Sequence, residues 1–266
     1  MDWGIGGLTV LAEILKYQPN LQISYFSDAG FTPYGKLSAS ELTQRLQTIF
    51  QWLEAKGCDG VVVACNAASA ALLQTSSEVL QKAGSGRQHK DNFHIPIYDV
   101  ITPTIQFLKQ SPFQRLGVIG GDATVQSHLY RDSLPMLDVT EQSAQPLSAL
   151  IEEGKLSQEE MEPLLRNIFT HLEPKQIDAL VLACTHYPAV AEHIVRLHPQ
   201  WKLVDPAVII ASELLTHLAP GPAQLRSYST TGSAKQMITS SMKAFGFTIS
   251  EVEVLPLSIF SDCSQF

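Results

Sequence analysis

A short apolar segment that ends in a cysteine occurs twice in this sequence. Residues 59–66 read Asp-Gly-Val-Val-Val-Ala-Cys-Asn, and residues 178–185 read Asp-Ala-Leu-Val-Leu-Ala-Cys-Thr. Each apolar run has the length of a β-strand and no alternation with polar residues, which predicts a strand buried on both faces of a parallel sheet. A helix-like pattern follows each cysteine. The chain is therefore expected to contain two strand–helix units of the same design.

Strand and helix patterns alternate along most of the chain, which predicts an α/β fold with parallel sheets and right-handed crossovers. Helical stripes are expected at residues 8–15, 42–53 and 161–172, and strands at residues 21–26, 59–64, 95–99, 116–120, 179–183 and 202–205. We predict two pseudo-symmetric lobes, each a mostly parallel sheet flanked by helices, with the active site in the cleft between them. The first lobe would comprise residues 1–94 and 207–266 and carry Cys65, and the second would comprise residues 95–206 and carry Cys184.

The composition excludes several classes of protein. The 266 residues carry a formal charge of −8 and no cluster of Lys and Arg, so neither nucleic acid nor an anionic membrane surface is an expected partner. No apolar run reaches the about 20 residues that span a bilayer, and the first residues do not form a signal peptide. We therefore expect a cytoplasmic protein that binds a small molecule, and the sequence leaves a homodimer open.

The four cysteines lack the spacing of a disulfide framework, which agrees with a reducing compartment. Cys58 and Cys263 have no matching counterparts and are expected to be structural. Cys65 and Cys184 end the two predicted strands, at the edge where open α/β sheets bind ligands. A buried free cysteine is often only packing, but packing does not require cysteine twice at one topological position. The pair therefore indicates a thiol on each side of one small substrate, suited to moving a proton between the two faces of a carbon.

A histidine follows the second of these cysteines. His186 lies two residues after Cys184, where an imidazole can lower the pKa of the thiol from about 8.5. Zinc is not expected, because Cys184 and His186 supply two ligands at most and the first unit has no matching histidine. His89 and His94 also lack metal-ligand spacing, and the polar stretch at residues 84–93 predicts an exposed loop at the boundary between the lobes.

The chain opens on a glycine-rich turn that contains Asp2, Gly4, Gly6 and Gly7. Its backbone N–H groups are expected to bind a carboxylate at the start of a helix, and Asp2 is either a catalytic or supporting carboxylate or a simple helix cap. The spacing is not that of a dinucleotide-binding turn. A helix entered in this way should follow a strand, yet only Met1 precedes the turn, so either the sheet lacks a strand or the true start lies upstream.

Three further features are weaker candidates. The turn at Pro33, Tyr34 and Gly35 follows a predicted strand and is placed to present backbone amides to a substrate. Thr124 and Glu152 carry suitable polar side chains, although either can simply cap a helix or face solvent.

Taken together, these motifs resemble those of the cofactor-independent glutamate racemases of the aspartate/glutamate racemase superfamily. Residues 2–11 resemble that family's opening Asp-Ser-Gly-x-Gly-Gly-Leu-[Ser/Thr]-Val-Leu, and residues 33–35 match its Pro-Tyr-Gly. Residues 64–70 resemble Ala-Cys-Asn-Thr-Ala-Ser-Ala, and residues 117–120 resemble the start of Gly-Val-Ile-Gly-Thr. Residues 152–154 resemble the end of Val-Glu-Glu-Gly, and residues 184–188 match Cys-Thr-His-Tyr-Pro. The motifs occur in order over nearly the whole chain.

The resemblance implies a two-base racemase that works without pyridoxal phosphate or metal and supplies D-glutamate for peptidoglycan. Cys65 and Cys184 would be the two bases, and Asp2, Glu152 and His186 would assist them. The substrate-binding residues would be Asp2, Trp3, Pro33, Tyr34, Gly35, Asn66, Ala67, Thr185 and His186.

Three positions depart from the family pattern. Trp3 replaces a serine, and Ala67 and Gly121 each replace a threonine. Each change removes a hydroxyl from a site that holds a polar substrate. The changes therefore affect the identity of the substrate more than the type of reaction. The alternatives are a sibling enzyme acting on aspartate or another small acid, and a non-catalytic ligand-binding relative. A dithiol redox protein is disfavoured because the chain has no Cys-x-x-Cys.

Overall fold

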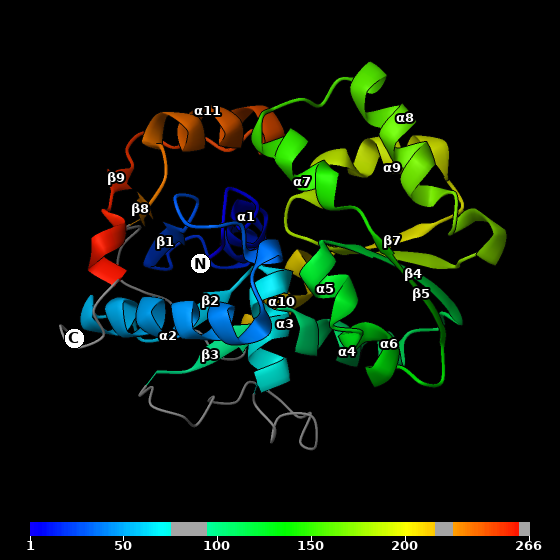
Figure 1. The fold of residues 1–266 in the computed structure, drawn as a ribbon, viewed down its shortest axis with the longest axis horizontal. Helices are drawn as coiled ribbons and strands as arrows, with labels where there is room; N and C mark the ends of the chain where they lie inside the picture. Colours follow the sequence, from blue (N-terminus) through cyan, green and yellow to red (C-terminus); the bar gives the residue numbers. More distant parts are fainter. Residues whose placement is uncertain (76–94, 216–225, 261–266) are drawn as a thin grey trace.

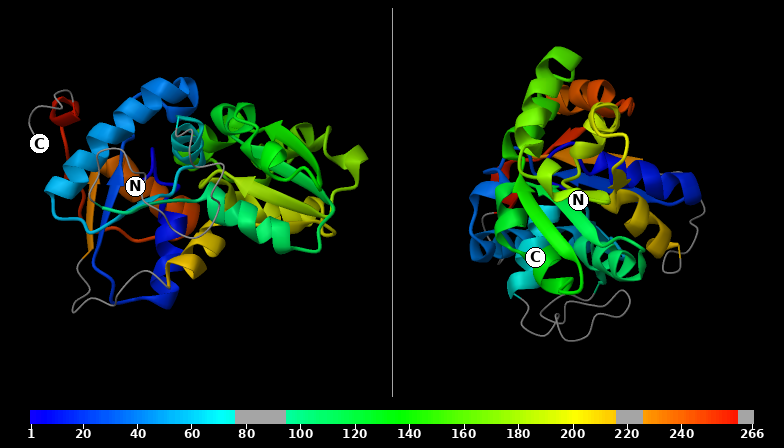
Figure 2. Two further views of the ribbon diagram at one scale, coloured as in Figure 1. Left: turned by 90° about the horizontal axis from the view of Figure 1, so that it is seen from below. Right: turned by 90° about the vertical axis from the view of Figure 1, so that its right-hand side faces the viewer.

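The computed structural model describes residues 1–75, 95–215 and 226–260 (Figure 1). The predicted loop at residues 84–93, together with His89, His94 and Cys263, lies outside the described residues. Within the described ranges, the strands pair in parallel and helices cover the sheets (Figure 2). This arrangement confirms the predicted α/β class with mostly parallel sheets flanked by helices.

A four-stranded sheet contains, in spatial order, β5 (Asp138–Ser143), β4 (Arg115–Gly120), β6 (Ala179–Ala183) and β7 (Lys202–Val204). Its helices are α4 (Ile101–Gln110), α5 (Asp122–Gln126), α6 (Leu129–Ser133), α7 (Gln145–Glu152), α8 (Gln158–Phe169) and α9 (Ala191–Leu197). The central strands β4 and β6 are apolar and almost entirely buried. The reason is that α7, α8 and α9 cover one face of the sheet and α4 and α6 cover the other (Figure 1).

The remaining strands form two smaller parallel sheets, one of β1 (Ile23–Ser27), β8 (Arg226–Thr230) and β9 (Glu253–Val254), the other of β2 (Val61–Val63) and β3 (Ile97–Asp99). Residues 1–2 lie between β1 and β2. The Asp2 N–H donates to the Phe26 carbonyl, and the Ala64 N–H donates to the Met1 carbonyl, both at 3.0 Å. Residues 1–2 therefore join the two sheets, and for two residues they occupy the strand position expected before the first helix.

The other helices are α1 (Leu8–Tyr17), α2 (Ala39–Ala55), α3 (Asn66–Thr75), α10 (Pro206–Leu214) and α11 (Ala234–Phe245), with short 3-10 turns η1 (Tyr34–Lys36), η2 (Glu173–Lys175), η3 (Tyr187–Val190) and η4 (Leu257–Phe260). α2 begins with a capping box, in which Ser38 and Glu41 each accept the backbone N–H of the other. Its predicted apolar stripe is buried in the core beside β2. None of the described helices is long and apolar enough to cross a membrane.

The two repeated segments form β2 and β6, as predicted. β5, β8 and β9 are missing from the sequence prediction, because their polar, partly exposed residues carry no apolar run. β3 pairs with β2, although the predicted second lobe begins at residue 95. The lobe boundaries themselves stay a prediction.

A buried ion pair holds the loop that follows β1. Arg45, in α2, donates to the two carboxylate oxygens of Asp28 at 2.9 and 2.7 Å. The hydroxyls of Tyr34 and Thr231 donate to the same carboxylate at 2.9 and 3.0 Å. Asp28 and Arg45 are 0% and 7% exposed, so solvent does not screen the pair.

Arg45→Met should lower the free energy of unfolding by about 3–5 kcal/mol, because it leaves the buried Asp28 carboxylate without its cation. Arg115→Met is the matched control. Arg115 pairs with Asp178 at the surface, with side chains 44% and 31% exposed, and exposed pairs contribute about 0–1 kcal/mol. Urea unfolding of both variants measures the difference, and equal losses would contradict the assignment of the cost to burial.

Candidate active site

Cys65 and Cys184 lie at equivalent places in their sheets. β2 ends two residues before Cys65, and α3 begins directly after it, whereas Cys184 directly follows the last residue of β6. Both side chains are half-buried. The charge of Cys184 is one of the causes that raise the pKa of Cys65. The fold therefore brings the two repeated thiols within electrostatic reach of each other.

Cys65 lies in surroundings that oppose ionisation. Burial, followed by the negative charge of Asp2, raises the pKa of the Cys65 thiol well above its usual value. The backbone N–H groups of Ala67 and Ala68, at the start of α3, act in the opposite direction but do not outweigh burial. With nothing bound, Cys65 is therefore a thiol at neutral pH and can act as a proton donor.

Cys184 has a histidine partner. Its Sγ lies 3.7 Å from Nδ1 of His186, whose Nε2 lies 2.7 Å from Oε1 of Glu152. Burial alone would lower the pKa of His186, but the hydrogen bonds to Cys184 and Glu152 and the charges of these residues raise it well above its usual value. His186 therefore keeps its proton at neutral pH and presents a positive charge to the Cys184 sulfur.

Asp2 lies buried between these groups. Its Oδ2 accepts the backbone N–H of Gly7 at 2.7 Å and the hydroxyl of Thr185 at 3.2 Å. Its Oδ1 is also buried but has no hydrogen-bond partner among the described residues. A buried carboxylate oxygen without a donor is costly, so Oδ1 marks a place where a bound molecule can donate. Asp2 thus contacts Thr185 in addition to the start of the first helix.

The glycine-rich turn holds carboxylates of the protein itself. The N–H of Ile5 donates to Oε1 of Glu152 at 2.8 Å, and that of Gly7 donates to Asp2. These two N–H groups are therefore not free to bind a substrate carboxylate, which corrects the expectation from the sequence. A Cβ on Gly4 would collide with Oε1 of Glu152. The turn needs glycine at this position because its backbone packs directly on that carboxylate.

Asn66 and Thr185, which directly follow the two cysteines, are both buried. Oδ1 of Asn66 accepts the hydroxyl of Tyr130 at 3.0 Å, which leaves the amide NH2 of Asn66 as a donor. The hydroxyl of Thr185 is used by Asp2. Tyr130, in α6, is missing from the sequence prediction, because a single tyrosine in a helix forms no motif.

The loop at Pro33, Tyr34 and Gly35 lies where η1 begins. Tyr34 is buried, and its hydroxyl is bound to the carboxylate of the buried ion pair, so this side chain anchors the loop. A Cβ on Gly35 would lie 3.0 Å from Oε1 of Gln145, and one on Gly121 would lie 2.9 Å from the same atom. Gln145 thus fills the space between this loop and the start of α5, a role that no sequence pattern indicates.

The three departures from the family pattern lie in different surroundings. Trp3 is half-buried, packs against the core beside β2, and donates through Nε1 to the Phe31 carbonyl at 3.1 Å. Ala67 packs against the same core, and its backbone N–H faces Cys65. At Gly121, the Gln145 side chain lies where a larger residue would project.

Other candidate residues lie outside this cluster. Thr124 is buried in α5 against Gly120, and Cys58 is half-buried and lines a separate cavity between β1 and β2. Over residues 1–75, 95–215 and 226–260, no group of three or more His, Cys, Asp and Glu side chains is arranged to hold a metal ion. The residues that the structure links to one another are Asp2, Cys65, Glu152, Cys184, Thr185 and His186.

The family model for Asp/Glu/Hydantoin racemase matches residues 33–214 of this chain. The glutamate racemase of Gloeobacter violaceus is 36% identical over 225 residues, which are 82% of this chain and 79% of that protein. The glutamate racemase of Desulforudis audaxviator is 34% identical over 212 residues, which are 77% of this chain and 73% of that protein.

Solved structures agree with these matches. The crystal structure of the glutamate racemase isoform RacE1 from Bacillus anthracis has a TM-score of 0.82 at 28% identity and covers 96% of both chains. The glutamate racemase from Thermus thermophilus has a TM-score of 0.82 at 26% identity, over 97% of this chain and 96% of that one. The chain belongs to the Asp/Glu/hydantoin racemase family and is an isomerase of the glutamate racemase type.

Proposed function

We propose that this enzyme interconverts L- and D-glutamate by two-base proton transfer between Cys65 and Cys184, without a metal ion or pyridoxal phosphate. The observation that carries the proposal is the pair of thiols after β2 and β6, which are within electrostatic reach of each other but have different neighbours. A two-base mechanism requires one thiolate and one thiol at the start of each turnover, and different neighbours supply that difference.

In the resting site Cys65 is the thiol, and protonated His186 lies where it would offset a negative charge on the Cys184 sulfur. The Cys184 thiolate removes the α-proton of one enantiomer and becomes a thiol. The electron pair of the broken C–H bond stays on the α-carbon and spreads into the substrate carboxylate. Cys65 then gives its proton to the opposite face and becomes the thiolate, so the other enantiomer meets the reverse protonation state.

The substrate ammonium is proposed to bind Asp2. Oδ1 of Asp2 is buried and lacks a donor among the described residues, and an ammonium supplies both a donor and a compensating charge. Neutralising Asp2 also removes one of the charges that raise the pKa of Cys65. Substrate binding therefore moves the pKa of Cys65 downward, in the direction that the reverse reaction requires.

The negative charge that develops on the substrate carboxylate needs donors held in place beforehand. We propose the NH2 group of Asn66, which Tyr130 orients, together with the backbone N–H groups of Tyr34, Gly35 and Thr185. Ala67 would use its backbone N–H at the start of α3, which faces Cys65, to stabilise the thiolate that forms there. Trp3 would support the site through packing, since its ring belongs to the core and its Nε1 is bound to a backbone carbonyl.

Glutamate is the proposed substrate because the relatives named above are glutamate racemases. The solved structure from Thermus thermophilus contains β-chloro-D-alanine, and the glutamate racemase from Francisella tularensis contains D-glutamate. The fold of the Picrophilus torridus aspartate racemase is less similar, with a TM-score of 0.55. We further propose that the D-glutamate serves peptidoglycan synthesis in the cytoplasm. A homodimer stays a prediction.

Racemisation should appear as a decay of the circular dichroism signal of L-glutamate to zero when the protein is present. The protein is first dialysed exhaustively against a chelator, and its absorbance is checked for pyridoxal phosphate. We expect full activity, because the proposed steps use only side chains of the chain. Faster turnover of L-aspartate would instead favour the sibling enzyme, and activity regained only with zinc or pyridoxal phosphate would refute the mechanism.

Cys65→Ser and Cys184→Ser should each abolish racemisation while leaving the fold intact, because each removes the base on one face only. Each variant should still eliminate the leaving group from one enantiomer of a β-chloro analogue of the substrate, and the two variants should prefer opposite enantiomers. Far-ultraviolet circular dichroism checks the fold. Equal residual elimination from both enantiomers would contradict the assignment of one base to each face.

Glu152→Gln should move the alkaline limb of the kcat/KM profile to lower pH. The change removes a charge that raises the pKa of His186, so His186 loses its proton earlier as the pH rises. We expect kcat/KM at neutral pH to fall about ten- to a hundredfold, as for a lost hydrogen bond to a charged group. Glutamine keeps an oxygen for the Ile5 N–H, so the turn stays in place.

Glu153→Gln, at the next position, is the matched control. Its side chain is 52% exposed and pairs with Lys155 rather than His186, so its profile should equal that of the unaltered enzyme. A Glu152→Gln profile with an unmoved alkaline limb would show that Glu152 does not set the protonation of His186.

A further inference from the structure

Gln145, at the start of α7, lies where two glycines leave room for its side chain. A Cβ on Gly121 would lie 2.9 Å from Oε1 of Gln145, and a Cβ on Gly35 would lie 3.0 Å from the same atom. Gly121 directly precedes α5, and Gly35 belongs to the loop at residues 33–35. A side chain at either glycine would displace the Gln145 amide, so the amide has this place only because both residues lack a Cβ.

The sheet places Gln145 at the same edge as the second cysteine. Cys184 directly follows β6, and Gln145 lies two residues after the end of β5. Both strands pair with β4 and all three run in parallel, so their carboxyl ends share one edge of the sheet. The Tyr187 hydroxyl donates to the Ala144 carbonyl at 2.9 Å, which joins the residue before Gln145 to the segment that carries Cys184. Gln145 therefore lies at the edge where an open α/β sheet binds its ligand.

One end of the Gln145 amide is bound and the other end is a free donor. Oε1 accepts the backbone N–H of Asp122 at 3.0 Å, and this bond identifies the oxygen, because an NH2 group does not accept from an N–H. Nε2 lies 3.6 Å from the Cβ position of Gly35 and more than 4 Å from that of Gly121, so the NH2 group points toward the loop. Among the described residues, Nε2 has no hydrogen-bond acceptor, and the side chain is only half-buried.

The acceptor that this NH2 group can reach is the α-carboxylate of the substrate. In the proposed mechanism the α-carbon lies between the two sulfurs, and its carboxylate binds the backbone N–H groups of Tyr34 and Gly35. Nε2 of Gln145 adjoins Gly35 and therefore lies beside these donors. A carboxylate has lone pairs for about four donors, so it can accept from Gln145 as well.

Gln145 also accounts for the missing hydroxyl at residue 121. Gly121 stands where the family pattern has a threonine, and the Gln145 side chain occupies the space into which that residue would project. A hydroxyl and a primary amide are both hydrogen-bond donors. The chain therefore lacks one donor at residue 121 and has another, from residue 145, beside the same space.

We propose that Gln145 is a further catalytic residue of the racemisation, whose NH2 group donates to the substrate α-carboxylate. The negative charge on that carboxylate increases as the α-proton leaves, so a fixed donor stabilises the transition state more than the bound substrate. The assignment rests on the proposed two-base racemisation and adds a donor that none of the sequence motifs indicates.

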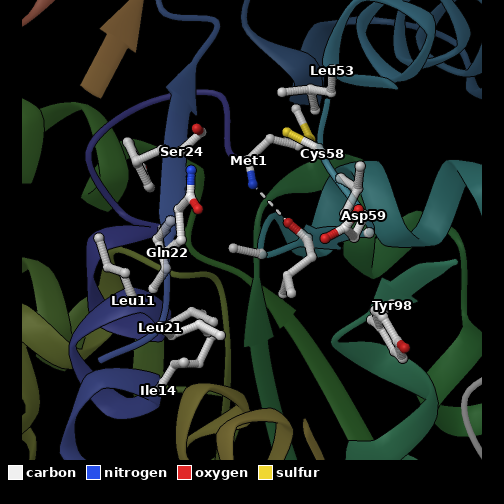
Figure 3. Close-up of a pocket in the computed structure, with 18 of the residues that line it drawn as sticks. Met1, Leu11, Ile14, Leu21, Gln22, Ser24, Leu53, Cys58, Asp59 and Tyr98 are labelled. Atoms are coloured by element: carbon white, nitrogen blue, oxygen red, sulfur yellow. Dashed lines mark hydrogen bonds between the residues drawn. The ribbon is translucent and has the colours of Figure 1, made fainter. Parts of the chain in front are cut away.

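Gln145→Glu separates donation to the substrate from support of α5. Glutamate keeps an oxygen for the Asp122 N–H but replaces the NH2 group with a negatively charged oxygen. We expect kcat for L-glutamate to fall about a hundredfold or more, as for the loss of a donor to a developing oxyanion. Gln22→Glu is the matched control, because it adds the same charge at an exposed position directly before β1 (Figure 3), and its kcat should not change. An unchanged kcat in Gln145→Glu would overturn the proposal.

An exchange with residue 121 tests whether the lost donor is the cause. Gln145→Ala should lower kcat about ten- to a hundredfold with little change in KM. Adding Gly121→Thr to Gln145→Ala places a hydroxyl in the vacated space, and we expect kcat to rise about tenfold above that of Gln145→Ala. Adding Gly121→Val instead supplies the same shape without a donor and should restore nothing. Restoration by threonine and valine alike, or by neither, would contradict the proposal.

Binding of D-glutamate separates a failure of this assignment from a failure of the proposed function. Isothermal titration calorimetry of the intact protein requires no turnover, and Gln145→Glu should raise the Kd at least about tenfold. If the unaltered protein does not racemise glutamate but the variant raises the Kd, the mechanism fails and the contact with Gln145 stands. If the unaltered protein racemises glutamate and Gln145→Glu changes neither kcat nor Kd, the assignment of Gln145 fails alone. Thermal unfolding of each variant confirms that it is folded.

Discussion

The geometry of the site depends on a single carboxylate oxygen, Oε1 of Glu152. It accepts the backbone N–H of Ile5 at 2.8 Å and lies 2.7 Å from Nε2 of His186. The same atom therefore positions the turn that carries Asp2 and the imidazole that faces Cys184. A displacement of Glu152 would disturb the surroundings of both cysteines at once, although neither cysteine touches it. The close approach of Gly4 to this oxygen shows how little room the arrangement leaves.

The repeat places two thiols at equivalent positions, but their neighbours are not equivalent. Cys65 has the carboxylate of Asp2 nearby, whereas Cys184 has the protonated imidazole of His186. Equivalent surroundings would drive both thiols toward the same protonation state, and a proton could then not be taken and given in one turnover. In the proposed mechanism, the repeat supplies the symmetry that a reaction at two faces of one carbon needs, and the charged neighbours supply the difference in protonation between the two sulfurs.

The strands that are buried on both faces can be predicted from the sequence. β2 and β6 are predictable because full burial requires consecutive apolar residues, and the cysteines follow directly from these strands. β5 and β8 escape prediction, because a strand of polar residues is defined by the strands it pairs with and not by its own residues. Tyr130 and Gln145 escape for a related reason, since each acts through a contact with a residue more than 20 positions away or across a loop. For the glycine-rich turn, the sequence predicts backbone amides that bind a carboxylate, but not which carboxylate. Two of these amides bind Glu152 and Asp2 of the protein itself.

Asp2 affects the pKa of Cys65, so the position of its carboxylate matters to the proposed proton donor. Backbone hydrogen bonds from residues 1–2 to β1 and β2 hold it, and each contributes only about 1 kcal/mol net. The Gly7 N–H and the Thr185 hydroxyl then fix Oδ2 of the carboxylate. Because Thr185 follows β6, the carboxylate beside one cysteine is placed in part by the residue next to the other cysteine.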